Sequence, residues 1–155
     1  EFLVGKQLPY VALTMLSYTV LLPVLVWILG IPITGNVLAL TLGALTYAFA
    51  ITGLGLLISA FVQTQVAAQF LTAILCVVLT TNFAGLLTPI STLVGGNYLI
   101  AVGFPASWFQ RVSLGVMTKG WGLQWAQLGP ACVAMMGFAV AYLVLARMFV
   151  RKQEA

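Results

Sequence analysis

The chain has 155 residues, of which 63% are hydrophobic and only 5% are charged, and its formal net charge is +4. An ordinary soluble domain carries roughly 25% charged residues, so this composition excludes that class. The 104 residues between Lys6 and Arg111 contain no Asp, Glu, Lys or Arg, and the whole chain contains no histidine. A surface built from this stretch would aggregate in water, so we predict that the chain lies mostly in a lipid bilayer.

Four apolar runs are long enough to cross a bilayer as helices, at about 20 residues for each crossing. The runs cover residues 8–29, 37–62, 66–87 and 128–148. They are separated by Gly30-Ile31-Pro32, by the polar patch Gln63-Thr64-Gln65 and by a segment that contains Pro89. The sequence therefore predicts an all-α membrane protein in which residues 1–155 form a single transmembrane domain with four transmembrane helices.

The segment 88–127 is too long for a structureless connection and too apolar for a free aqueous loop. Its glycines and prolines prevent one continuous span, so we predict two short helices that dip into the outer leaflet as a re-entrant or interfacial segment. The second helix is expected to start at Pro105, because the first turn needs no N–H there. The residues assigned to this outer region are Pro89, Pro105, Trp108, Arg111 and Lys119.

The apolar residues of this second helix form one stripe, made of Trp108, Phe109, Val112 and Val116. We expect the polar residues Ser107, Gln110, Arg111 and Thr118 to face elsewhere, a pattern typical of a helix at a membrane interface. The alternative is a plain surface helix under an outer loop.

The cations predict the orientation of the chain in the membrane. Lys6 lies near one end, and Arg147, Arg151 and Lys152 lie near the other. Because four spans place both ends on the same side, the positive-inside rule makes that side cytoplasmic. Arg111 and Lys119 then lie outside, against the rule, but they are outnumbered. This distribution is typical of a topological signal, so we expect the lipid bilayer and no nucleic acid as a partner.

Few side chains are available for catalysis. The chain has no histidine or aspartate, and its two glutamates are Glu1 and Glu154, at the ends. Catalytic triads, paired carboxylates and metal clusters therefore have no members, and we expect no enzyme activity, metal or cofactor in this chain. Ion-coupled carriers usually place ionisable residues inside the membrane, and these spans hold none apart from Arg147 near a helix end.

Uncharged polar residues within the spans are the candidates for a substrate path. They are Tyr18, Tyr47, Gln69, Thr80, Thr81 and Asn82. Threonine hydroxyls often bond the backbone of their own helix, which is the structural alternative for them. The amide of Asn82 is expected to need partners outside its helix, either on another helix or in a path. Such a path suits a hydrophobic or amphipathic substrate better than an ion.

Several motifs together resemble the ABC-2 type exporter permeases. The stretch E-F-L-V-G-K-Q-L-P-Y at 1–10 resembles the cytoplasmic segment that enters their third span, and G-L-G-L-L-I-S at 53–59 resembles a stretch before the next cytoplasmic turn. G-L-L-T-P-I-S at 85–91, Phe104-Pro105 and Thr118-Lys119 resemble their outer re-entrant region. The ending R-K-Q-E at 151–154 resembles bacterial members, including the permease half of ribosome-associated-ATPase-like fusions.

This resemblance implies a permease subunit in the bacterial inner membrane that exports its substrate by ATP-driven alternating access. It implies spans three to six, with the first two spans and any ectodomain missing, and a dimer with a second copy or a paralogue. ATP and Mg²⁺ would bind a partner or fused ABC ATPase, next to the coupling residues Glu1, Phe2, Gly5, Lys6, Gln63 and Gln65. The family commonly has Arg-Gly where this chain has Leu114-Gly115.

Two other functions stay open at this point. In one, the spans anchor an ATPase that has a non-transport role. In the other, which the missing charges disfavour, they form half of an ion-coupled carrier.

Overall fold

A computed structural model describes residues 2–62, 64–83 and 95–153. The helices are α1 (Phe2–Pro23), the π-helical turn η1 (Val24–Ile28), α2 (Val37–Phe61), α3 (Gln65–Phe83), α4 (Gly96–Val102), α5 (Pro105–Lys119) and α6 (Trp125–Gln153). These described ranges contain no strand, so the all-α prediction is confirmed. Two expected features, Pro89 and the start of the outer segment, lie outside the described residues.

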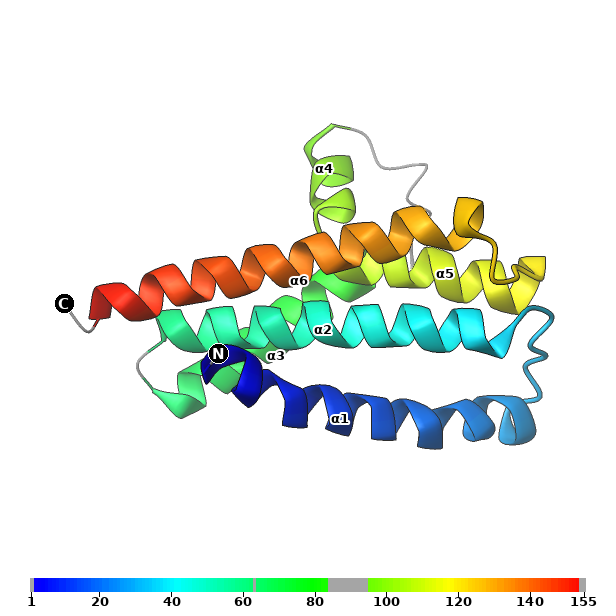
Figure 1. Cartoon of the computed structure of the whole chain (residues 1–155), viewed down its shortest axis with the longest axis horizontal. Helices are drawn as coiled ribbons and strands as arrows, with labels where there is room; N and C mark the ends of the chain where they lie inside the picture. Colours follow the sequence, from blue (N-terminus) through cyan, green and yellow to red (C-terminus); the bar gives the residue numbers. More distant parts are fainter. Residues whose placement is uncertain (1, 63, 84–94, 154–155) are drawn as a thin grey trace.

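Within the described ranges, four helices are long and apolar enough to cross a membrane. They are Gly5–Ile28, which combines α1 with η1, then Val37–Phe61, Gln65–Asn82 and Trp125–Phe149, and each overlaps one predicted span. The start of α1 and the end of α6 lie toward the same end of the bundle as the end of α2 and the start of α3 (Figure 1). We call this the terminal end. The connection between α1 and α2, the end of α5 and the start of α6 lie at the opposite end, the loop end (Figure 1).

The helix ends at the loop end follow from local sequence. The chain leaves η1 through Gly30, whose φ of 64° favours glycine. Asn36 caps α2, because its side-chain oxygen accepts a hydrogen bond of 2.8 Å from the Leu38 N–H. Gly120 ends α5 in the left-handed conformation, and Pro105 begins α5 as predicted.

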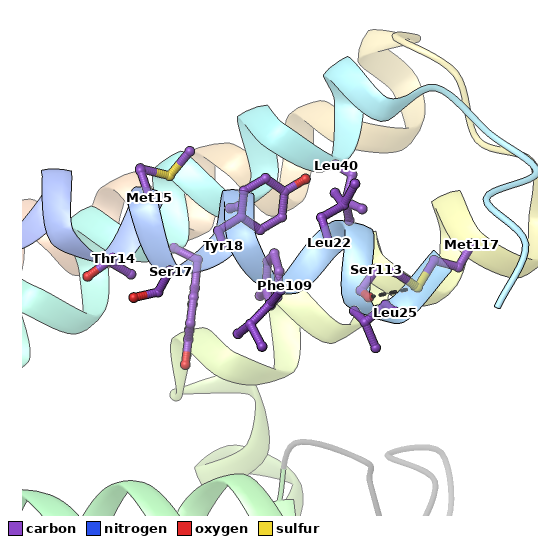
Figure 2. Close-up of a pocket in the computed structure, with 13 residues that line it drawn as sticks. Thr14, Met15, Ser17, Tyr18, Leu22, Leu25, Leu40, Phe109, Ser113 and Met117 are labelled. Atoms are coloured by element: carbon purple, nitrogen blue, oxygen red, sulfur yellow. Dashed lines mark hydrogen bonds between the residues drawn. The ribbon is translucent and has the colours of Figure 1, made fainter. Parts of the chain in front are cut away.

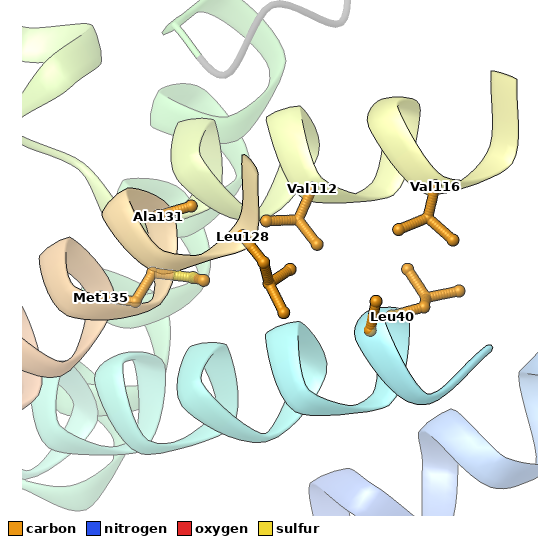
Figure 3. Packing of buried hydrophobic residues seen from close by; sticks show 7 residues of the cluster. Leu40, Val112, Val116, Leu128, Ala131 and Met135 are labelled. Atoms are coloured by element: carbon orange, nitrogen blue, oxygen red, sulfur yellow. The ribbon is translucent and has the colours of Figure 1, made fainter. Parts of the chain in front are cut away.

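The main core lies between α2, α5 and α6. Leu40 of α2 packs with Val112 and Val116 of α5 and with three residues of α6, Leu128, Ala131 and Met135 (Figure 3). Close approach depends on Gly43, because a Cβ atom there would lie 2.8 Å from the Cγ1 atom of Val112. Small residues thus bring α2 and α5 together, as in other membrane helix pairs.

Helix α5 and the residue before it pack along α2 from the loop end to beyond the middle of α2. Near its end, the N–H of Gly35 bonds the carbonyl of Val116 at 2.9 Å. Phe109 stacks on Tyr47, the eleventh of the 25 residues of α2, with ring centroids 4.8 Å apart. Phe104, just before α5, belongs to a buried cluster with Leu54, beyond the middle of α2. Helix α5 is thus packed into the bundle beside α2, which is the arrangement that the re-entrant prediction requires.

The structure differs from the predicted orientation of Ser107, which lies just after the break between α4 and α5. This side chain was expected to face away from the packed side, but it is only 2% exposed. Its hydroxyl donates to the Ala101 carbonyl and to the Phe104 carbonyl, and the Trp108 Nε1–H donates to the Val102 carbonyl at 2.8 Å. A broken backbone buried in a membrane protein needs such partners, so the polar residue turns inward.

Candidate functional site

A cleft of about 310 Å³ lies between α1, α2 and α5, and we call it the α1–α2–α5 cleft. Figure 2 shows Thr14, Ser17 and Tyr18 of α1 on one wall and Phe109, Ser113 and Met117 of α5 on another. The rest of the lining consists of Leu40, Ala44 and Tyr47 of α2, Met15, Leu21 and Leu22 of α1, and Leu25 of η1. The lining carries no charged side chain and combines aliphatic, aromatic and hydroxyl groups.

Three hydroxyl groups that line this cleft, those of Ser17, Tyr18 and Ser113, have partners within the protein. The hydroxyls of Tyr18 and Thr41 lie 3.3 Å apart, and this contact joins α1 to α2. Ser17 donates to the Leu13 carbonyl of its own helix at 3.0 Å, and Ser113 donates to the Met117 sulfur at 3.7 Å. Hydroxyl oxygens that already donate still have lone pairs to accept from a ligand. The cleft therefore suits a mainly apolar molecule with a few polar groups.

The predicted substrate-path residues fall into two groups. Tyr18 and Tyr47 line the α1–α2–α5 cleft together. The other four, Gln69, Thr80, Thr81 and Asn82, lie on α3, which does not contribute to the cleft lining. The structure therefore brings the two tyrosines to one site and leaves the α3 residues apart from it.

Two of the three polar side chains near the end of α3, those of Thr81 and Asn82, bond their own helix. Thr81 donates to the Val77 carbonyl at 2.7 Å, and the Asn82 amide nitrogen donates to the Val78 carbonyl at 2.9 Å. These bonds stay within α3, and the expectation that the amide also has partners outside its helix stays a prediction. The side chain of Asn82 reaches back one turn, as serine and threonine do.

The predicted coupling residues that the structure describes lie at the terminal end. Phe2, Gly5 and Lys6 belong to the first turns of α1, and Gln65 begins α3 (Figure 1). Glu1 and Gln63 lie outside the described residues. Gly5, Lys6 and Gln65 are exposed, so this end offers an accessible surface.

Gln7 is a polar residue that the sequence reasoning did not single out. Its side chain is 1% exposed, and its Nε2 donates to the Phe49 carbonyl at 2.8 Å and to the Thr52 Oγ1 at 2.9 Å. These bonds join the start of α1 to the terminal half of α2. The sequence contains one signal for this residue: its amide directly precedes an apolar run. A buried amide in such a place needs hydrogen-bond partners within the protein.

The residues of the outer region that the structure describes lie on α5. Pro105 begins the helix, Lys119 ends it, and Arg111 is exposed with its guanidinium carbon 4.9 Å from the centroid of the Trp108 ring. Pro89 lies outside the described residues. Cys76 and Cys132 are free thiols, and the described residues contain no cluster of His, Cys, Asp and Glu that would hold a metal ion.

Comparison with known proteins identifies the family. The family described as ABC-2 family transporter protein matches residues 1–147, which is nearly the whole chain. Comparison with curated proteins and with solved structures gave no match. With four membrane-crossing helices and this match, the chain belongs to the ABC-2 transporter family.

Proposed function

We propose that this chain is the permease subunit of an exporter that moves a hydrophobic or amphipathic substrate outward across the bacterial inner membrane. The family match over residues 1–147 carries the proposal. ABC-2 membrane domains are transport subunits of ABC transporters, not themselves catalytic, and work with an ABC ATPase, generally as dimers. Here ATP and Mg²⁺ bind the ATPase, and a second copy or a paralogue supplies the other half.

The α1–α2–α5 cleft supports the proposed substrate class. Its lining is uncharged and contains the stacked pair Tyr47 and Phe109 together with the hydroxyl of Tyr18. An ion would find no countercharge on these walls, whereas an apolar molecule with hydroxyl or carbonyl groups would find complementary surfaces. We assign Tyr18 and Tyr47 to the substrate path on this basis, with Gln69, Thr80, Thr81 and Asn82 of α3 as further candidates.

The terminal end supports coupling to the ATPase. We assign this contact to Glu1, Phe2, Gly5, Lys6, Gln63 and Gln65, and this end is then cytoplasmic. Movement of the α1 start is passed to α2 through the two hydrogen bonds of Gln7. ATP binding to the ATPase pair then biases two arrangements of the bundle, which alternates access to the substrate path.

The test uses the assembled transporter, with its ATPase and both membrane halves, reconstituted in lipid vesicles. We expect amphipathic candidate substrates to stimulate ATP hydrolysis and to accumulate on the side away from the ATPase only when ATP is present. The control is the same preparation with an ATPase that cannot hydrolyse ATP. Absence of both stimulation and flux for every lipid and drug tested would reject transport and favour the membrane anchor.

A further inference from the structure

Arg111 is a cation inside the part of the fold that we assign to the membrane. Its helix neighbours fix its depth, because Val112 packs on Gly43 and Phe109 stacks on Tyr47. These two α2 residues lie six and ten positions after the start of α2, which is about 9–15 Å along the helix from the loop end. Arg111 therefore lies below the loop-end interface, although its side chain is exposed on the surface of the bundle.

The side chain of Arg111 points away from the nearer interface. Its guanidinium carbon lies 4.9 Å from the ring centroid of Trp108, which is one turn farther from the loop end. Side chains of a helix lean toward its N-terminus, and here this direction carries the guanidinium away from the loop end, where an arginine in lipid would extend to reach water. Trp108 is itself held in place, because its Nε1–H donates to the Val102 carbonyl at 2.8 Å. The cation is thus positioned on an anchored aromatic ring.

The residues that the structure describes include no carboxylate side chain, because the two acidic residues of the chain, Glu1 and Glu154, lie outside them. An anion stabilises a guanidinium at membrane depth, and the fork of N–H groups of the guanidinium matches phosphate and carboxylate geometry.

We propose that Arg111, placed by Trp108, binds the acidic headgroup of an amphipathic molecule that lies beside α5 in the bilayer. Rotation of the headgroup toward the guanidinium forms charge-assisted hydrogen bonds while the acyl chain stays in the lipid. The inference rests on the proposed function in one respect, because it makes the amphipathic substrate an anionic one. The binding site itself is a property of α5 and does not require ATP.

The test measures binding to the assembled transporter in phosphatidylcholine nanodiscs without ATP. The probes are dodecyl phosphate, dodecanol, which has the same tail without the charge, and inorganic phosphate, which has the charge without the tail. We expect Arg111→Gln to weaken dodecyl phosphate binding by roughly tenfold to a hundredfold, the loss of a hydrogen-bonded charge pair, and to leave dodecanol unchanged. Arg111→Lys keeps the charge but not the planar fork, so an intermediate loss is expected.

The matched control is Lys119→Gln, which removes a cation from the end of the same helix. It is expected to leave dodecyl phosphate binding unchanged. Competition by phosphatidylglycerol added to the nanodiscs would identify a bilayer lipid as the source of the headgroup, and its absence would identify a diffusing amphiphile. Either result supports the acidic-headgroup site.

Two results would overturn the inference. One is that the Arg111→Gln variant binds dodecyl phosphate as tightly as the wild type does, which would mean that the arginine pairs with a protein carboxylate instead. The other is equal binding of inorganic phosphate and dodecyl phosphate. A failure of the proposed function would look different: dodecyl phosphate binding would still depend on Arg111, but no substrate flux and no stimulation of ATP hydrolysis would be observed. If flux is observed and Arg111→Gln changes neither binding nor flux, only the inference is rejected.

Discussion

A buried amide joins the predicted coupling segment to the bundle. Replacing Gln7 by Leu keeps its size but removes the bonds to the Phe49 carbonyl and the Thr52 hydroxyl. Interhelical hydrogen bonds in membranes contribute about 0.6 kcal/mol on average, so Gln7→Leu should lower the free energy of unfolding by about 1 kcal/mol. Unfolding in mixed micelles of sodium dodecyl sulfate and dodecyl maltoside measures this change.

The double variant Gln7→Leu with Thr52→Val tests whether the bond itself is responsible. Its loss should be smaller than the sum of the two single losses, because the shared bond can be removed only once. Thr81→Val is the control, since that hydroxyl donates to the carbonyl of its own helix, and it should change stability little. Strict additivity of the two single changes would contradict the proposed bond.

At the scale of helices, the contact between α2 and α5 depends on one missing side chain. A Cβ at Gly43 would lie 2.8 Å from Val112 Cγ1, so Gly43→Ala should push the helices apart and cost about 1–3 kcal/mol of stability. Gly55, in the same helix, has open space around it, so Gly55→Ala should be neutral or stabilising, since alanine favours a helix by up to about 1 kcal/mol. Thermal unfolding of both variants measures the difference.

Shortening Val112 provides the complementary experiment. The combination of Gly43→Ala with Val112→Ala should recover part of the stability that Gly43→Ala loses, because the smaller side chain makes room for the new methyl group. No recovery would mean that the loss has another cause than this contact.

Local signals in the sequence placed the helices better than they placed individual polar side chains. Pro105 at the first position of α5 was predicted because its ring suits the first turn, and this rule depends only on neighbouring residues. The predicted orientation of Ser107 was wrong, because its hydroxyl bonds the Ala101 carbonyl at the end of α4 and the Phe104 carbonyl, at the break between α4 and α5, whose geometry the helical pattern of α5 does not contain. For Asn82, the sequence reasoning did not consider that its amide nitrogen can donate to a carbonyl one turn away in its own helix.

The candidate site was predictable only in part, for a related reason. Tyr18 and Tyr47 were chosen as polar residues within spans, and they meet in the cleft because α1 and α2 pack side by side. Phe109 and Ser113 join them from a helix that the sequence placed only in the outer leaflet. The depth of α5 depends on its packing against Gly43 and Tyr47, which helical periodicity alone does not encode.

At the scale of the whole molecule, the two ends of the bundle must face opposite sides of the membrane. In a variant with Cys76 and Cys132 replaced by alanine, we introduce Thr64→Cys at the terminal end or Leu123→Cys at the loop end. Both positions are exposed, and Leu123 is 53% exposed. The cations near both chain ends predict that the terminal end is cytoplasmic. A membrane-impermeant maleimide should therefore label Leu123→Cys in intact cells and Thr64→Cys only after permeabilisation.

Each alternative labelling pattern has a distinct physical meaning. The reverse pattern would mean that the protein has the opposite orientation in the membrane. The coupling residues would then lie outside, where an ATPase that uses cellular ATP cannot reach them. Labelling of both positions from one side would contradict the crossing of α2, since Thr64 and Leu123 adjoin opposite ends of helices packed along it. The expected pattern places the start of α1 on the ATP side and the end of α5 on the other. A movement that ATP hydrolysis causes at the terminal end must then pass along α1 and α2 to reach the cleft and Arg111. Gln7 makes the first contact between these two helices on that route, so its loss should leave ATP hydrolysis in place while reducing movement of the substrate.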